Sequence, residues 1–352
     1  MRIADLETPV PVVDLDVLEG NLTKMQTYCN DHGLRLRPHI KTHKCPEIAQ
    51  MQIDRGAVGI TCQKLTEAEV MADAGFLDLL LSYPLVGVGK TARLAALAQR
   101  ANVAVSVDSE QTLETAAEAA AISGSRISVW IDFDSGAGRT GVPSVEDALR
   151  LANCVLDTLG LEFAGLITYP LSPEAGAIYE QAATLFAREG VAIPGFSGAG
   201  TPTSLTSHQT HGLTEVRHGT YVFHDRSTVG AGAATLDECA LHIWATVVSR
   251  PSRDRAILDS GSKSLSSDRV PETVGQGHGL IGEYPDAVIE RLYEEHAIVR
   301  VPEGSEGLEI GERVRVLPNH VCVAVNLHDS LVGVRGDTVE RRLQILGRGK
   351  TQ

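Results

Sequence analysis

The segment GITCQKLTEAEVMADAGFLDLLLS, residues 59–82, decides the fold class of this chain. An apolar run at 59–62 leads into 64–74, where apolar residues recur with helical spacing, and a second apolar run follows at 77–82. Such an order is typical of a βαβ unit whose strands are buried in a parallel sheet. The segment therefore predicts an α/β fold.

The same alternation continues along the first two thirds of the chain. We predict eight strands, at 34–38, 59–62, 77–82, 103–107, 126–132, 161–168, 193–197 and 215–223. Helical patterns such as those at 89–101 and 109–122 lie between them. Eight βα units favour a closed (β/α)8 barrel of the TIM type, whose active site lies at the C-terminal ends of the strands. An open, doubly wound sheet is the structural alternative.

After about residue 238 the pattern changes to strand-like segments separated by Gly, Pro and charged turns. Examples are CALHIWATVVS, RAILDSG, EHAIVRV and RVRVLPNHVCVAV. These segments predict a β-rich C-terminal domain. We expect the barrel to span 10–238 and the β-domain to span 239–352 together with 1–9.

Charge and cysteine usage exclude several classes of partner. The chain has 352 residues and a formal net charge of −14, which argues against binding to nucleic acid or to an anionic membrane. No apolar segment approaches the ~20 residues of a membrane span, and the start of the chain does not resemble a secretory signal. The six cysteines are scattered without a CxxC pair, which is typical of reduced thiols and predicts a cytoplasmic protein.

The stretch RLRPHIKTHKCPE, residues 35–47, follows the first predicted strand. If the strand conformation persists, His39, Lys41 and His43 project to one face. Imidazoles on both sides and a desolvated position lower the pKa of a lysine and make its amine usable for Schiff-base chemistry. A strand end with solvated charges and a metal site at His39 and His43 are the alternatives.

Polar loops also follow the later strands. DFDSGAGRTG, residues 132–141, presents Arg139, and SGAGTPTS, residues 197–204, offers backbone N–H groups to a phosphate. The segment HGTYVFHD carries Tyr221, which would close over the same phosphate. Each loop by itself also fits an ordinary βα turn, and SGAGTPTS does not match a P-loop.

One further pair lies in the predicted β-domain. His320 and Cys322 in LPNHVCVAVNLHD are two residues apart and share a face if the segment is a strand. Imidazole and thiolate together suit Zn²⁺. A buried cysteine beside a histidine with a structural role is the alternative.

Together these motifs resemble the D-threonine aldolase and D-serine dehydratase family, a branch of the alanine-racemase-like, fold-type III enzymes that use pyridoxal phosphate. RPHIKTHK is the most specific motif, and the resemblance implies that Lys41 carries the cofactor with His39 and His43 as flanking catalytic groups. It further implies cofactor contacts from Arg139, Tyr169, Ser197, Gly198, Gly200, Thr201 and Tyr221, and a divalent metal, Zn or Mn, on His320 and Cys322.

The resemblance implies a lyase that acts on small D-3-hydroxy amino acids and cleaves them to glycine and an aldehyde. CQKLTEAEV and VNLHD resemble the aldolases. Cys322 resembles the dehydratases, which would convert D-serine or D-3-hydroxyaspartate into a 2-oxo acid and ammonia, and Pro170 stands where aldolases often have histidine. An amino-acid racemase and a non-catalytic carrier of the cofactor are further alternatives. The resemblance also implies a homodimer.

Overall fold

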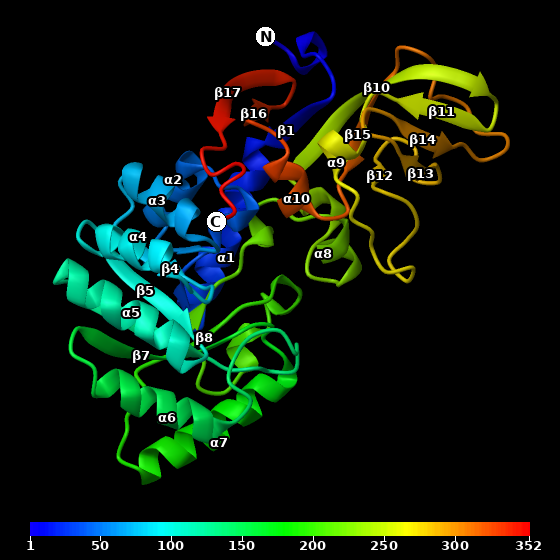
Figure 1. Cartoon of the computed structure of the whole chain (residues 1–352). Helices are drawn as coiled ribbons and strands as arrows, with labels where there is room; N and C mark the ends of the chain where they lie inside the picture. The colour runs from blue at the N-terminus through cyan, green and yellow to red at the C-terminus, as the bar shows by residue number, and fades with distance from the viewer. The chain divides into compact units, whose positions relative to one another are not determined.

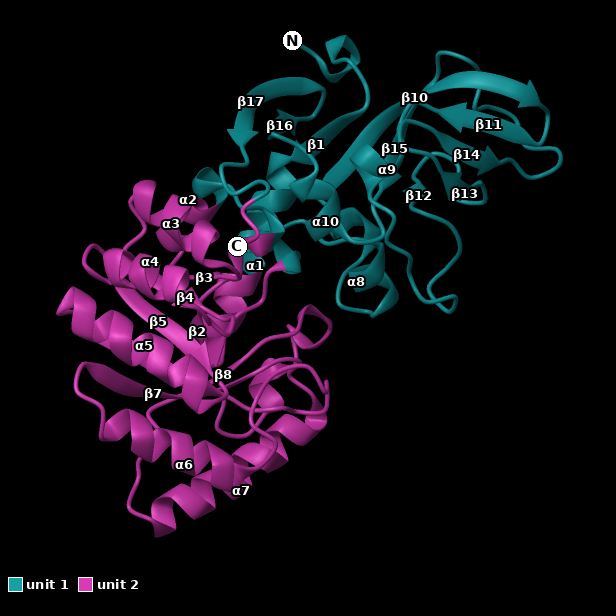
Figure 2. Cartoon of the chain, in the orientation of Figure 1, with its two compact units in different colours: residues 1–24, 42–48, 220–349 teal, residues 25–41, 49–219, 350–352 magenta.

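The computed structural model describes residues 1–352, which form two compact units. The barrel unit comprises residues 25–41, 49–219 and 350–352, and the β unit comprises residues 1–24, 42–48 and 220–349 (Figure 2). The chain crosses between the two units five times, and one crossing is the peptide bond between Lys41 and Thr42. No helix combines the length and the apolar composition needed to cross a membrane.

The barrel unit contains a sheet of eight parallel strands. These are β2 (Arg35–Leu36), β3 (Ile60–Cys62), β4 (Asp78–Leu81), β5 (Asn102–Val107), β6 (Ile127–Asp132), β7 (Leu161–Thr168), β8 (Phe196–Gly198) and β9 (Glu215–Val216), in the order β2-β9-β8-β7-β6-β5-β4-β3. A parallel bridge between His39 and Thr61, with Thr61 N donating to Pro38 O at 2.8 Å, joins the two ends of the sheet. The predicted (β/α)8 barrel is therefore confirmed.

Helices cover the outside of this sheet (Figure 1). They are α1 (Leu15–Asp31) and α2 (Pro46–Asp54), which both begin in the β unit, and α3 (Leu65–Asp73), α4 (Val88–Ala98), α5 (Glu110–Ser123), α6 (Val145–Leu156) and α7 (Pro173–Arg188). In α6, for example, Ser144 caps the first turn by accepting a hydrogen bond from Asp147 N. Ala148, Leu151, Ala152 and Val155 then follow at helical spacing, and all four are buried.

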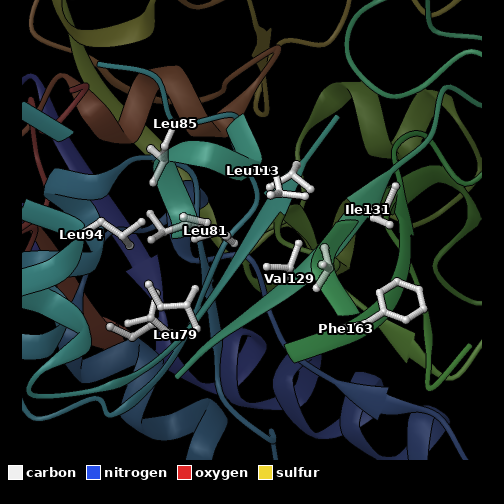
Figure 3. Packing of buried hydrophobic residues seen from close by; sticks show 14 of the residues in the cluster. Leu79, Leu81, Leu85, Leu94, Leu113, Val129, Ile131 and Phe163 are labelled. Carbon is white, nitrogen blue, oxygen red and sulfur yellow. The ribbon is translucent and has the colours of Figure 1, made fainter. Parts of the chain in front are cut away.

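The strands are mainly apolar on both faces, because one face packs on helices and the other fills the barrel. Leu79 and Leu81 of β4 and Val129 and Ile131 of β6 belong to the core beneath the helices (Figure 3). The residues between them, such as Trp130, form a separate cluster with Leu80 and Ile167. Side chains alternate along a strand, so the second cluster is the barrel interior.

The β unit contains a nine-stranded sheet that is antiparallel except for one pair. Its strands are β1 (Val10–Asp14), β10 (Leu241–Ser252), β11 (Arg255–Leu258), β12 (Leu280–Ile281), β13 (Val288–Leu292), β14 (Ala297–Arg300), β15 (Arg313–Leu317), β16 (Ser330–Arg335) and β17 (Thr338–Gln344). The long strand β10 pairs with both β11 and β15, so the order β10-β11-β14-β13-β12-β15 closes on itself. The predicted β-rich C-terminal region is confirmed.

Short helices complete the two units. The α-helices are α8 (Arg226–Gly230), α9 (Ser262–Leu265) and α10 (Val321–Asn326). The 3-10 turns are η1 (Ile3–Asp5), η2 (Ile40–Thr42), η3 (Thr201–Thr203), η4 (Ser207–Gln209), η5 (Thr220–Val222) and η6 (Leu236–Glu238). Two expectations are wrong here. The strand predicted over 215–223 ends at Val216, before η5, and the segment 321–326 is helical rather than extended.

Gly59 directly precedes β3, the strand that closes the barrel, and we expect it to tolerate substitution poorly. This residue has φ +157°, and a Cβ atom would lie 2.6 Å from Asp78 Oδ1 and 2.8 Å from Asp78 O. We expect Gly59→Ala to lower the free energy of unfolding by about 1–3 kcal/mol more than Gly75→Ala does. Gly75 also has positive φ, at +98°, but its Cβ would meet open space. Equal shifts of the urea unfolding midpoint in the two variants would contradict the crowding at Gly59.

Candidate functional site

Lys41 lies just beyond the C-terminal end of β2, but not on an extended strand. The backbone of His39 is still paired as in a strand, because its N–H donates to His218 O at 3.0 Å. The turn η2 then begins at Ile40. The expected alternation of three side chains on one face is therefore wrong. Lys41 sits in a tight turn, half-buried, next to the buried His39.

A polar network surrounds the Lys41 amine. Gln63 Oε1 accepts a hydrogen bond from Lys41 Nζ at 3.4 Å and one from His39 Nε2 at 3.0 Å. Ser82 Oγ lies 3.3 Å from the same His39 nitrogen. These residues follow three neighbouring strands, β2, β3 and β4, so barrel closure brings them together. The network orients the imidazole and gives the amine a polar partner.

His43 belongs to the β unit, where it is completely buried. Its Nδ1 lies 3.1 Å from both the backbone N and the backbone O of Cys45. Lys44, which follows His43 directly, has φ +50°. The placement of His43 is thus explained by backbone hydrogen bonding within the β unit.

Tyr169 brings two predicted site residues of the barrel unit together. The Arg139 guanidinium lies 4.8 Å from the centre of the Tyr169 ring, and Lys41 Nζ lies 5.8 Å from it. Both distances are within the range of cation–π attraction. The ring is 43% exposed, so a phenol edge and two cations are presented at the C-terminal end of the barrel.

The loop that carries Arg139 is folded around Asp134. Its Oδ1 accepts hydrogen bonds from Gly136 N at 2.9 Å and Ala137 N at 2.8 Å, an arrangement that rigid turns use. Gly141 closes the loop, and a Cβ atom there would lie 2.5 Å from Asp134 N. A larger residue at Gly141 would therefore clash with the loop backbone, and the loop holds Arg139 at the barrel end.

The glycine-rich loop begins on β8. Gly198 packs so closely that a Cβ atom would lie 2.6 Å from Leu171 Cδ1, and Gly200 has φ +156° before η3 begins at Thr201. The Ser197 hydroxyl is already engaged, because it donates to Glu215 Oε1 at 2.9 Å and accepts from Arg217 Nε at 2.9 Å. Backbone amides are therefore the main donors that this loop offers to an anion. Tyr221, in η5, is buried in the β unit.

Arg217 is a buried cation that the sequence patterns did not single out. Its Nη2 donates to Thr168 O at 2.6 Å. Burial lowers the pKa of Arg217 to about 10, although Asp132 and Glu215 oppose that shift. Burial also raises the pKa of Asp132 to about 6. The fixed guanidinium connects Ser197 with the strand end that carries Tyr169.

His320 and Cys322 do come together in the β unit, although at a helix start rather than on a strand. His320 is the N-cap residue of α10, and Cys322 lies in its first turn. The buried Asp225 carboxylate accepts from His320 Nδ1 at 2.9 Å and from Val321 N at 3.0 Å. Thr42 Oγ1 lies 3.2 Å from Cys322 Sγ. A carboxylate on one imidazole nitrogen is how metal-binding histidines are commonly oriented.

The same contacts set the charge of the histidine. Burial lowers the pKa of His320, but hydrogen bonds to Asp225 and Cys322 outweigh that effect and raise the pKa to about 11. The stabilisation from this charge is fully present below the ordinary pKa of 6.5 and is lost as pH rises through about 11. A bound cation would replace this proton, because a ligating imidazole is neutral.

Three residues at these sites were missed by the sequence reasoning. Gln63 directly follows the strand at 59–62, so the rule that singled out Arg139 also applies to it. Asp225 begins the Asp-Arg-Ser-Thr pattern of an N-cap, in which Thr228 N donates to Asp225 Oδ1 at 2.8 Å. Arg217 has no local signal, since its role depends on contacts across the barrel.

Asp225→Asn is expected to lower the pKa of His320 toward 6.5, because the amide carries no negative charge. Asparagine is also a good N-cap, so α8 should remain folded. The measurement is an NMR titration of the imidazole in metal-free protein. Asp329→Asn, at an 86% exposed carboxylate paired with Arg348, is the matched control and should leave the titration unchanged. An unchanged His320 titration in Asp225→Asn would show that the carboxylate does not set this pKa.

Comparisons with known proteins agree with these features. Residues 13–227 match the family model of the alanine racemase N-terminal domain, and residues 240–334 match a putative serine dehydratase domain. D-threonine aldolase from Arthrobacter sp is 36% identical over 366 residues, covering 99% of this chain and 94% of that protein. D-threo-3-hydroxyaspartate dehydratase from Delftia sp. (strain HT23) is 32% identical over 346 residues, covering 90% of this chain and 91% of that protein.

The comparison with solved structures indicates the same family. The crystal structure of D-threonine aldolase from Filomicrobium marinum superposes with a TM-score of 0.91 at 33% identity, covering 100% of this chain and 98% of that chain. The family expected from the sequence motifs is thereby confirmed. This chain belongs to the D-threonine aldolase and D-serine dehydratase family of alanine-racemase-like, pyridoxal-phosphate-dependent enzymes.

Proposed function

We propose that this enzyme is a pyridoxal-phosphate- and divalent-metal-dependent lyase that cleaves D-3-hydroxy amino acids to glycine and an aldehyde. The observation that carries the proposal is the Asp225–His320–Cys322 arrangement, present in the same chain as a lysine at the barrel strand ends. A lysine suits Schiff-base chemistry, and an oriented imidazole with a thiol suits a cation. Racemization does not require the imidazole and thiol pair.

The residues of the barrel unit fit the cofactor. Lys41 supplies the amine, and Gln63 and His39 orient it. The backbone at Gly198, Gly200 and Thr201 offers N–H groups for a phosphate, with Tyr221 as a further proposed contact. Arg139 and Tyr169 would contact the ring of the cofactor. The Arg139 guanidinium lies 4.8 Å from the centre of the Tyr169 ring, and this contact keeps both side chains at the barrel end. The cofactor, when bound, supplies an electron sink for cleavage at the substrate's Cα.

The residues of the β unit fit a metal. Asp225 engages Nδ1 of His320, which leaves Nε2 as the ligand atom beside Cys322. The chain has no group of three or more His, Cys, Asp or Glu side chains arranged for a metal, so this pair would leave positions for water and substrate. Imidazole and thiolate favour Zn²⁺ over Mn²⁺. The metal, when bound, supplies a Lewis acid for the substrate's hydroxyl group.

The chain's own groups then have defined tasks. Lys41 would hold the cofactor, and Gln63 positions the Lys41 amine to hold a proton during the reaction. His39 keeps Gln63 in place through its hydrogen bonds to Gln63 and Ser82. We propose no task for His43 beyond that of a flanking residue. The Arg139 cation and the Tyr169 phenol bind and orient at the barrel end. Arg217, fixed by Ser197 and Thr168, keeps the strand ends in place.

Dehydration of D-serine or D-3-hydroxyaspartate is the second candidate. Cys322 favours it, because a thiolate holds Zn²⁺ well and zinc assists the departure of hydroxide. The similarity to D-threo-3-hydroxyaspartate dehydratase points the same way. The higher identity to D-threonine aldolase supports cleavage as the first candidate. We also propose that the enzyme is a cytoplasmic homodimer.

Product analysis tests the reaction. With D-threonine we expect glycine and acetaldehyde, and removal of the metal by a chelator should abolish both. Pyruvate and ammonia from D-serine, with no cleavage of D-threonine, would replace the aldolase proposal with the dehydratase. Activity that survives chelation and interconverts enantiomers would replace both with a racemase.

Lys41→Ala tests the cofactor attachment. We expect the variant to lose the visible absorbance of the bound cofactor and to lose activity by at least about 10³-fold, since no other amine lies in this network. Lys24→Ala is the control, because Lys24 is half-exposed on α1 and pairs with Glu238. Absorbance and activity that are the same in wild type and Lys41→Ala would remove Lys41 from its proposed role.

A further inference from the structure

A cavity lies at the N-terminal ends of the barrel strands, the end opposite to Lys41. Its volume is about 410 Å³, within the range of roughly 300–1,000 Å³ that is typical of small-molecule sites. Trp130, Ala104 and Ala164 line its apolar part. Trp130 is only 5% exposed, and Ala104 and Ala164 lie on the two strands that flank its own.

Charged side chains of both signs form the rim of this cavity. They are Arg35, Arg37, Arg126, Asp78, Glu162 and Glu215. Three cations and three anions make the rim neutral in sum. Arg37 is held firmly, since it pairs with Asp78 and its Nε donates to the buried Glu215 Oε2 at 3.1 Å. This part of the rim is a fixed wall.

The remaining charges form only long ion pairs with one another. Arg126 Nη1 lies 3.8 Å from Glu162 Oε2, and Arg35 Nη2 lies 3.6 Å from Glu215 Oε2. Both separations exceed the ~2.7–3.2 Å of an N–H···O hydrogen bond. The side chains of Arg126 and Glu162 are 73% and 54% exposed. A guanidinium and a carboxylate therefore stand side by side at the cavity with hydrogen-bonding capacity to spare.

We propose that this cavity binds the zwitterion of an α-amino acid with an apolar side chain. The ligand's carboxylate pairs with Arg126 and Arg35, whose forked N–H groups suit it, and its ammonium group pairs with Glu162. The two long ion pairs, Arg126–Glu162 and Arg35–Glu215, are thereby replaced by short pairs with the ligand's own carboxylate and ammonium groups. The side chain lies against Trp130. A simple anion is disfavoured, because three carboxylates on the rim would repel it, and an inorganic ion would leave the apolar surface uncovered.

The site is independent of the proposed reaction, and it can be tested by the fluorescence of Trp130. The chain has two tryptophans, so Trp244→Phe in the holoenzyme leaves Trp130 as the only one. We expect L-phenylalanine to change this fluorescence saturably, whereas hydrocinnamate, which lacks the ammonium group, and phenethylamine, which lacks the carboxylate, should bind at least about tenfold more weakly. L-phenylalanine has no 3-hydroxyl group and is not a substrate of the proposed cleavage.

Two variants locate the binding. Arg126→Met and Glu162→Gln, both at exposed side chains, should each weaken L-phenylalanine binding by at least about tenfold. Arg188→Met, at a 72% exposed arginine on α7, is the matched control and should bind like the parent. An absence of saturable change in the parent, equal affinity in all three variants, or hydrocinnamate binding as tightly as L-phenylalanine would each overturn the proposal.

Discussion

The barrel unit depends on the hydrogen bonds that the buried carboxylate of Glu215 accepts from neighbouring strands. Glu215 is completely buried, and it receives Arg37 Nε at 3.1 Å and the Ser197 hydroxyl at 2.9 Å. These contacts join β9 to β2 on one side and to β8 on the other. Because a buried charge that loses its partner costs about 3–5 kcal/mol, the three strands are held in one register. The chain of contacts continues through Ser197 to Arg217 and then to Thr168 O.

This register has consequences at both ends of the barrel. At the C-terminal ends of the strands it brings Lys41, His39, Gln63 and Ser82 into one network, although 41 positions separate Lys41 from Ser82. At the N-terminal ends it sets Arg37 as one wall of the cavity above Trp130. A closed parallel barrel has two such ends, and chemistry ordinarily gathers at the first. At the N-terminal ends of these strands, Arg35, Arg126 and Glu162 form only long ion pairs.

The sequence patterns anticipated each barrel strand, because in a parallel sheet covered on both faces most residues of a strand are apolar and the helices between have a clear period. The strand predicted over 161–168 coincides with β7, and that over 126–132 differs from β6 by one residue. The patterns failed where a turn competes with an extended chain. Pro38 and the bridge at His39 end the strand, so η2 carries Lys41, and His320 caps α10 rather than lying on a strand.

The sequence by itself determined the order of the βα units, the β-rich character of the last third, and the identity of the reactive groups, because these depend on side-chain type and local period. Only the tertiary structure decided which groups meet. Asp225 reaches His320 across 95 positions, and Arg217 reaches Thr168 across 49. No local pattern encodes such pairs. They arise because a buried polar group must find a partner wherever the closed sheets place one.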